Sequence, residues 1–359
     1  MTTTEATLAE GPEGALDRIW YTRCPVPTAS GLAHRLGRLS RAFEERGLEV
    51  GVLQDAPPEI AAHHFDHRLL GLFREGGNVP ALAARSEGAP TRLIGLTWID
   101  EGQSVLTLPG SGITGAADLA GRRVAVPAWA RTPGRSFPRA MALHGFVGAL
   151  ASADLTLDDV ERVTVAAREP TVGADSRAFS WPGLPELAAG EVDAVYVKGA
   201  RAFEEADEFG AVVAVDLDTL PDRRLRVNNG TPRPITVHER TLAERPELVV
   251  DFLVETLRAA DWAASHPGEV RDILAGETRS GATGVLRAYA DGFHTDLAPD
   301  LSDERLDLLH LQQDLLHRHG FLAEPVDVRS WAAHEPLAEA RRIVDGRRRN
   351  SSTSNGTPS

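Results

Sequence analysis

The feature that most constrains the fold of this chain is an alternation of short apolar runs with longer amphipathic segments. The short runs have the length of strands and are bounded by glycine, proline or polar residues, whereas the longer segments carry apolar residues at helical spacing. This alternation is typical of α/β proteins, in which helices cover a sheet. Beyond Thr241 the pattern changes, and nearly all of the chain is expected to be helical.

The expected elements follow from these runs. Apolar runs predict strands at residues 19–22, 48–53, 91–98, 104–108, 160–165, 194–197 and 211–216. Helical spacing of apolar residues predicts helices at residues 30–46, 68–73, 79–86, 141–152, 185–189, 246–265, 282–290 and 302–319. Between residues 113 and 126 a short helix is expected to lead into a further strand.

Length and charge narrow the class of protein. A chain of 359 residues fits two domains of ordinary size. Its net charge of −14 argues against nucleic acids and anionic membranes as partners, although a local arginine can still bind a small anion. No apolar run approaches the ~20 residues that span a bilayer. The polar N-terminus lacks the apolar stretch of a secretory signal, so a cytoplasmic protein is expected.

Cys24 is the only cysteine, and it is followed by Pro25 and Pro27. A lone thiol cannot form an internal disulfide or anchor a thiolate metal cluster. The prolines stiffen the chain after it, which would hold the side chain in one place. Two interpretations remain open: a small buried hydrophobe, or a reactive thiol. A thiol with an ordinary pKa of ~8.5 is mostly protonated at neutral pH, so catalytic use requires a partner such as histidine.

Histidines and an arginine–glycine motif follow Cys24. The cluster of His63, His64 and His67 does not have zinc-helix spacing, so no metal is expected, and surface histidines are the simpler interpretation. The motif Arg74-Glu75-Gly76-Gly77 fits either a helix C-terminus or an anion site made of a guanidinium group and exposed backbone N–H groups. The ordered set of Cys, His, Arg and Gly-Gly is more specific than any one motif.

Further candidates for ligand contacts are aromatic or basic. Trp129 and Trp181 lie among prolines and small residues, and either could form the wall of a cleft. Lys198 and Arg201 follow a strand, where α/β folds place ligand contacts, although a solvated helix start explains them equally well.

Segments 118–126 and 190–196, with the helical last third of the chain, resemble the type II periplasmic binding protein fold. In that fold two α/β lobes face each other over a cleft, and the chain crosses between them twice. The resemblance implies crossings near residues 108–112 and 217–228. It divides the chain into a disordered N-terminus (1–16), a discontinuous lobe one (17–110 and 226–345), lobe two (111–225) and a disordered tail (346–359).

Residues 21–29, with the sequence Cys-Pro-Val-Pro at their centre, resemble the start of the aryl sulfinate desulfinases. The resemblance continues through the pair His64-Phe65 and through Arg-x-Gly-Gly, and it spans roughly residues 19–333. It implies a cytoplasmic, cofactor-free C–S lyase that releases sulfite. In that family the Cys-Pro-Val-Pro segment carries the essential cysteine, which corresponds here to Cys24.

This resemblance implies a small aromatic sulfinate as substrate and assigns a role to each matching residue. Arg74 would bind the sulfinate oxygens, with Gly76 and Gly77 beside it and the Gly77 N–H donating a further bond. Cys24 would either protonate the ring carbon or attack the sulfur, and His64 would orient the thiol and return its proton. Glu75 is expected to pair elsewhere, because a carboxylate would repel the anion.

The chain departs from the family at residues 127–139 and 170–182, which would cover the substrate. Here the family's pocket tryptophan corresponds to Phe137, and Trp129 remains a candidate for the wall. Two alternative functions also fit the fold. One is a cytoplasmic solute-binding protein of the sulfonate or nitrate type without catalysis, and the other is a thiamine-pyrimidine synthase, whose cysteine-rich iron segment this chain lacks. A monomer is expected.

Overall fold

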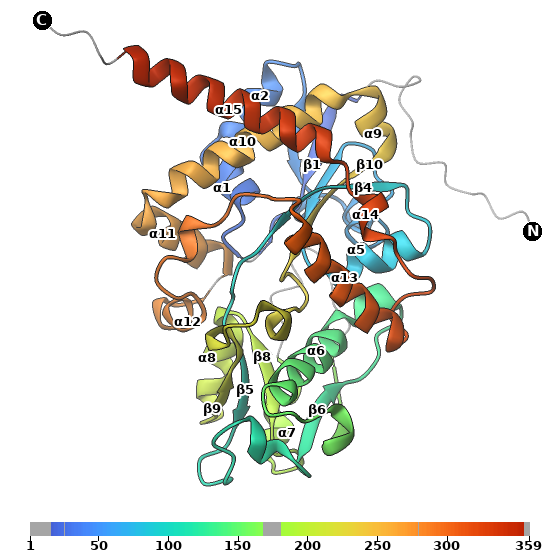
Figure 1. The fold of residues 1–359 in the computed structure, drawn as a ribbon, viewed down its shortest axis with the longest axis vertical. Coiled ribbons are helices and arrows are strands. Elements are labelled where there is room, and N and C mark those ends of the chain that lie inside the picture. Colours follow the sequence, from blue (N-terminus) through green and yellow to red (C-terminus); the bar gives the residue numbers. More distant parts are fainter. Residues whose placement is uncertain (1–15, 25, 168–180, 279, 355–359) are drawn as a thin grey trace, which may run out of the picture.

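The computed structural model describes residues 16–24, 26–167, 181–278 and 280–354. The described chain forms two α/β lobes, one above the other in Figure 1, as the resemblance implied. Pro25, residues 170–180 of the stretch 170–182, and residues 355–359 of the tail lie outside the described residues. Within the described residues, no helix combines the length and the apolar character that crossing a bilayer requires.

Lobe one is built on a five-stranded sheet with the order β2-β1-β3-β10-β4. Strand β1 is parallel to both of its neighbours, whereas β10 enters between β3 and β4 and is antiparallel to both. The strands are β1 (Arg18–Tyr21), β2 (Glu49–Val52), β3 (Leu72–Glu75), β4 (Thr91–Thr97) and β10 (Arg233–His238).

Helices pack around this sheet, and α10 lies against both α1 and α15 in the upper part of Figure 1. The helices before the first crossing are α1 (Ala29–Arg35), α2 (Arg38–Glu44), α3 (Pro58–Ala61), α4 (His63–Asp66) and α5 (Asn78–Ser86). Those after β10 are α9 (Glu239–Glu244), α10 (Pro246–Ala264), α11 (Pro267–Thr278), α12 (Ala282–Ala288), α13 (Asp303–Arg318), α14 (Val328–Trp331) and α15 (His334–Ser354).

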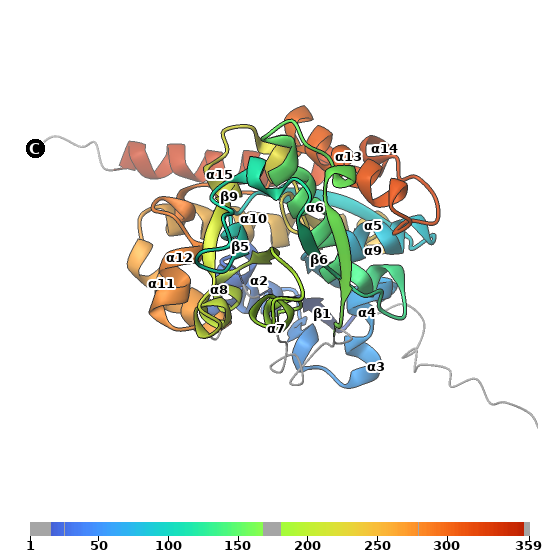
Figure 2. The same cartoon turned by 90° about the horizontal axis from the view of Figure 1, so that it is seen from below.

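Lobe two contains a three-stranded sheet, β8-β5-β9, and a parallel pair, β6-β7. Helices α6 and α8 lie on opposite sides of β5 in both views (Figures 1 and 2). Its elements are β5 (Gln103–Thr107), β6 (Arg123–Pro127), β7 (Glu161–Val165), β8 (Val195–Lys198), β9 (Val212–Asp216), α6 (Phe137–Ala151), α7 (Leu184–Ala188) and α8 (Ala200–Glu208).

The first crossing between the lobes lies earlier than the sequence suggested. Strand β5 pairs with β8 and β9, so it belongs to lobe two, and the chain changes lobe between Thr97 and Gln103 rather than near residues 108–112. The chain returns between Asp216 and Arg233, which includes the expected stretch 217–228. An apolar run identifies a strand but does not reveal which sheet it joins, and this explains the shift.

Three local predictions were wrong. Residues 72–75 form β3, where a helix was expected over 68–73, because a strand buried on both faces reads as a continuous apolar run. The helix expected over 30–46 is two helices, broken at Gly37, whose φ of 67° lies in the left-handed region. Helix α15 continues to Ser354 into the tail expected to be disordered, since its arginines favour helix and Arg348 pairs with Asp261.

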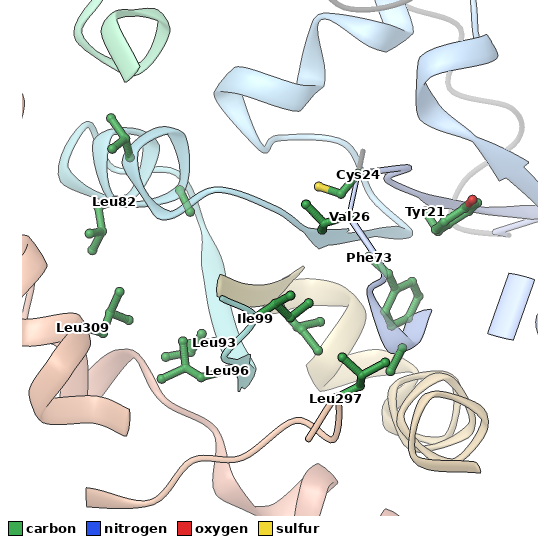
Figure 3. Close-up of a cluster of buried hydrophobic side chains, with 14 of the residues drawn as sticks. Tyr21, Cys24, Val26, Phe73, Leu82, Leu93, Leu96, Ile99, Leu297 and Leu309 are labelled. Atoms are coloured by element: carbon green, nitrogen blue, oxygen red, sulfur yellow. The ribbon is translucent and has the colours of Figure 1, made fainter. Parts of the chain in front are cut away.

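The larger apolar core extends from lobe one into lobe two. The loop that follows β1 carries Cys24 and Val26 into this core beside Phe73, with the thiol directed away from the Tyr21 ring (Figure 3). A second apolar cluster, centred on Phe146 and Leu150, lies within lobe two. The only cysteine therefore lies in the core and close to the junction of the lobes.

Candidate functional site

The direction of the strands brings distant residues to one edge of the lobe-one sheet. Because β1 and β3 are parallel, their carboxyl ends lie together; Cys24 follows β1, and Glu75 is the last residue of β3. Strand β10 runs the other way, so its first residue, Arg233, lies at the same edge and pairs with Thr97 at the end of β4. Glu101 follows from β4 a few residues later.

Cys24 contacts residues at the ends of two neighbouring strands, β3 and β10. Its Sγ lies 3.2 Å from the backbone oxygen of Glu75, to which the thiol can donate, and 3.5 Å from the Nη1 of Arg233. The side chain is only 8% exposed. Burial raises the pKa of the Cys24 thiol, and the positive charges of Arg233 and Arg74 only partly offset this effect. Cys24 is therefore protonated at neutral pH in this structure.

Arg74 is buried on β3, and one of its two terminal nitrogens has no hydrogen-bond partner. Its Nε donates to the His64 backbone oxygen (3.2 Å), and its Nη1 donates to the Gly77 backbone oxygen (3.1 Å). Its Nη2 is buried and makes no hydrogen bond. Burial lowers the pKa of Arg74 to about 10, so the group stays charged at neutral pH. A buried, charged donor without an acceptor is costly for the protein alone and suits an anionic ligand.

Gly76 and Gly77 lead from β3 into α5 and leave no room for side chains. A Cβ on Gly76 would lie 2.9 Å from the Arg74 guanidinium carbon, and one on Gly77 would lie 2.3 Å from the Oδ1 of Asn229. That same oxygen accepts a hydrogen bond from the Val79 N–H in the first turn of α5 (3.1 Å). The glycines thus allow Asn229, from the return crossing, to cap α5 beside Arg74.

Arg233 belongs to a buried cluster of charges. Its Nη2 donates to the Oε1 of Glu101, and the Nζ of Lys198 lies 3.6 Å from the same oxygen. Lys198 also donates to the backbone oxygen of Asn229 (2.8 Å). The Nε of Arg233 and the hydroxyl of Tyr289 are buried in the described structure without a hydrogen-bond partner. The pKa of Tyr289 is raised, first by burial and then by Glu101.

Glu75 pairs away from these cations, as expected. Its Oε2 accepts from the Ser30 hydroxyl, and its Oε1 accepts from the Thr97 hydroxyl (2.8 Å). Burial raises the pKa of the Glu75 carboxyl. Of the charges that act on Cys24, those of Arg233 and Arg74 have larger effects than the carboxylates of Glu75 and Glu101. The site is locally positive within a protein of net charge −14.

His64 lies on α4 and reaches the site through its backbone. Its carbonyl accepts the Arg74 hydrogen bond, while its ring packs edge-on against Phe65 and its Nδ1 is buried without a partner. Burial, with Arg74 next in importance, holds the pKa of His64 well below its ordinary value, so the imidazole is neutral. Among the described residues no hydrogen bond joins His64 to Cys24, whose partners are Glu75 and Arg233.

The other candidates lie in residues 127–139, between β6 and α6. Trp129 is 47% exposed and packs on Phe321, with ring centroids 4.4 Å apart, whereas Phe137 is half-buried at the start of α6. Gly134 lies against α5, and the Arg135 guanidinium lies 4.0 Å from the centroid of the Phe65 ring. This segment of lobe two therefore contacts the lobe-one elements that flank Arg74.

The chain has relatives among known proteins. Residues 43–270 match the model of a family described as NMT1/THI5 like. The 2'-hydroxybiphenyl-2-sulfinate desulfinases of Rhodococcus erythropolis and Rhodococcus qingshengii are each 30% identical to this chain over 352 residues, which cover 89% of the chain and 93% of each relative. The chain belongs to this desulfinase family. The family resemblance is thereby confirmed.

Solved structures agree with the desulfinase family. The desulfurization enzyme DszB is 28% identical, with a TM-score of 0.72 over 91% of this chain and 99% of that one. A Cys-to-Ser variant of DszB, in complex with biphenyl-2-sulfinic acid, has a TM-score of 0.71, 25% identity, and coverage of 92% and 100%. The aliphatic sulphonate binding protein SsuA of Escherichia coli, 19% identical over 90% of this chain and 93% of its own, has a TM-score of 0.61 and confirms the fold.

Sequence reasoning missed half of the buried polar site of this desulfinase family member. The sequence patterns did not indicate Arg233, Glu101, Tyr289 or Asn229. Lys198 was noted only as a secondary candidate. One signal was available for Arg233: a charged residue immediately before Pro234, at the start of an apolar strand, must find a buried partner.

Proposed function

We propose that this protein is a desulfinase that cleaves the C–S bond of an aromatic sulfinate and releases sulfite. The observation that carries the proposal is the buried Arg74 Nη2 without a partner, beside a protonated Cys24 in a positive site. A sulfinate is an anion with two acceptor oxygens, which match a guanidinium fork. The names of the 30% identical relatives support the same chemistry.

The proposed reaction starts with sulfinate binding to Arg74, with the Gly77 N–H as a further donor. The Cys24 thiol gives its proton to the ring carbon, the C–S bond breaks, and the products are the arene, SO₂ and a thiolate. Water converts SO₂ into bisulfite and a proton, and the thiolate is reprotonated. The sum is ArSO₂⁻ + H₂O → ArH + HSO₃⁻. The raised pKa of the thiol supports this route, because it keeps the proton on Cys24 until it is used.

The second route begins with attack of the Cys24 sulfur on the sulfinate sulfur. The ring carbon receives the thiol proton, and an S–SO₂⁻ adduct of Cys24 forms, which water hydrolyses to the thiol and bisulfite. The two routes differ in whether a covalent adduct exists. Intact-protein mass spectrometry of the reacting enzyme distinguishes them, since only the second route adds the mass of SO₂ to the chain.

His64, Trp129 and Phe137 have supporting roles in the proposal. His64 would return the proton to the thiolate, and its unpartnered Nδ1 is available for a proton once the ring approaches Cys24. Phe137 and Trp129 would shield the aromatic ring of the substrate, because their segment already contacts the lobe-one elements around Arg74. We further propose a cytoplasmic monomer that needs no cofactor; a single free thiol suits a reducing compartment.

The test is to incubate the protein with biphenyl-2-sulfinic acid and measure sulfite. We expect the wild-type protein to release sulfite and Cys24→Ser to release none, because a serine hydroxyl is a far weaker acid than a thiol. Circular dichroism should show that both proteins fold alike. Binding without turnover by the wild-type protein would instead identify a solute-binding protein, and full activity of Cys24→Ser would exclude the thiol.

A further inference from the structure

Arg233 contacts the atom on which charge must develop in the proposed reaction. Its Nη1 lies 3.5 Å from the Cys24 Sγ, within the range of an N–H···S contact, and both groups are buried. Its Nη2 is held by Glu101, which fixes the plane of the guanidinium group. Arg233 is also the first residue of β10, whose two neighbouring strands anchor its backbone.

The ion pair with Glu101 does not by itself account for the buried charge of Arg233. Glu101 also lies within 3.6 Å of the Lys198 Nζ, so one carboxylate is shared by two buried cations. Arg74, buried nearby, bonds only to backbone carbonyls and has no carboxylate partner among the described residues. Buried charge without a counterion is costly. A bound anion and a thiolate on Cys24 would both reduce this cost.

We propose that Arg233 is a further catalytic residue, which stabilises the negative charge on the Cys24 sulfur when the thiol gives up its proton. This inference rests on the desulfinase function proposed above. When the S–H bond breaks and the proton moves to the ring carbon, the electron pair stays on Sγ, where the Arg233 N–H can donate to it. The two arginines then have separate roles: Arg74 binds the sulfinate, and Arg233 stabilises the thiolate of Cys24.

Arg233 would act in the same way in either route. In both routes the thiol proton moves to the ring carbon and negative charge develops on Sγ, which Arg233 stabilises. Apart from Arg233, the charged or titratable groups that act on Cys24 are Arg74 and Glu75 on β3, Glu101 after β4, and Tyr289 after α12. Arg233 is the only one among the described residues whose side chain has a hydrogen-bond contact with the sulfur.

The experiment measures the pKa of the thiol itself, without substrate. Because Cys24 is the only cysteine, the absorbance of the wild-type protein at the thiolate band minus that of Cys24→Ser reports one group, and tyrosine ionisation cancels. We expect Arg233→Met to move the thiolate midpoint upward by about one pH unit, and Arg233→Lys to move it less. An unchanged midpoint in folded Arg233→Met would overturn the proposal.

Kinetics and a second variant complete the test. With biphenyl-2-sulfinic acid, Arg233→Met should lower kcat roughly 100-fold with little change in KM, because the contact matters only when charge develops.

If Arg233→Met does not fold, Glu101→Gln should lower the thiolate midpoint, since it removes a negative charge that competes for Arg233; near-UV circular dichroism verifies the fold. An upward or absent shift contradicts the proposal. Failure of the wild-type protein to release sulfite would reject the desulfinase function and leave the thiol titration valid.

Discussion

At the scale of single residues, the site combines two buried guanidinium groups with different surroundings. Arg74 bonds to two backbone carbonyls and keeps its Nη2 without a partner, whereas Arg233 is paired with a carboxylate and contacts the thiol. A lysine has the same charge but lacks the planar fork. Both positions are therefore expected to be sensitive to the geometry of the donor as well as to its charge.

Arg74→Lys tests this sensitivity at the sulfinate. We expect binding of biphenyl-2-sulfinic acid, measured by calorimetry in the Cys24→Ser background, to weaken by about 2 kcal/mol, or roughly 30-fold. Lysine cannot reach the carbonyls of His64 and Gly77 and the ligand together. Arg85→Lys is the matched control on α5, where the arginine bonds only to the Ala89 carbonyl among the described contacts. Equal affinity of the Arg74→Lys variant and the control would place the anion elsewhere.

Local motifs could predict only the part of the site that is local in sequence. Cys24, Arg74 and Gly77 were identified because they lie in two short segments, one just after β1 and one at the end of β3. Arg233 and Glu101 were missed because they reach the thiol only through the antiparallel pairing of β10, which no motif encodes. His64 was expected to contact the thiol, but it reaches the site through its carbonyl, and sequence does not reveal whether a side chain or a backbone atom makes the contact.

At the scale of elements, a buried carboxylate is one of the groups that join the two crossings between the lobes. Asp218, on the return crossing, accepts hydrogen bonds from the backbone N–H groups of Gly102 (2.7 Å) and Gln103 (3.2 Å) on the outward crossing. Burial, with nearby Asp100, raises the pKa of Asp218 to about 7. The Asp218 carboxyl, which links the two crossings by hydrogen bonds, therefore changes its charge near neutral pH.

Asp218→Asn should make stability less dependent on pH. A carboxyl whose pKa is raised on folding contributes most stability below its unfolded pKa of about 4, and this contribution is lost as pH rises to about 7. The neutral amide has no such loss. We expect the variant to gain about 2 kcal/mol relative to the wild-type protein between pH 5 and pH 7, measured by urea unfolding. A constant difference between the two proteins across this range would contradict the assignment.

At the scale of the whole molecule, the fold was predictable because the alternating pattern is distributed along the chain, and the desulfinase relatives and SsuA confirm it. The lobe boundary was less predictable, since it depends on which sheet β5 joins. In the structure, residues 127–139 of lobe two contact α5 and Phe65 of lobe one, and these contacts link the lobes beside the site.

Substrate binding should therefore strengthen this link. We expect amide hydrogen exchange in residues 127–139 to slow when biphenyl-2-sulfinic acid binds to Cys24→Ser, because a ring held between the lobes would fix the segment against α5. The segment 157–165, on β7 and the turn before it, provides an internal control and should not change. Slower exchange around Arg74 alone would mean that lobe one binds the substrate without cover from lobe two.

The position of β10 between β3 and β4 also determines when the sheet of lobe one can be completed during protein synthesis. Protein synthesis delivers β1 to β4 first, then all of lobe two, and only afterwards the strand that fills the gap in the first sheet. Lobe two is continuous in sequence and can fold while the ribosome is still working. A chain that stops before Arg233 would therefore carry Cys24 without the cation that contacts it in the complete fold.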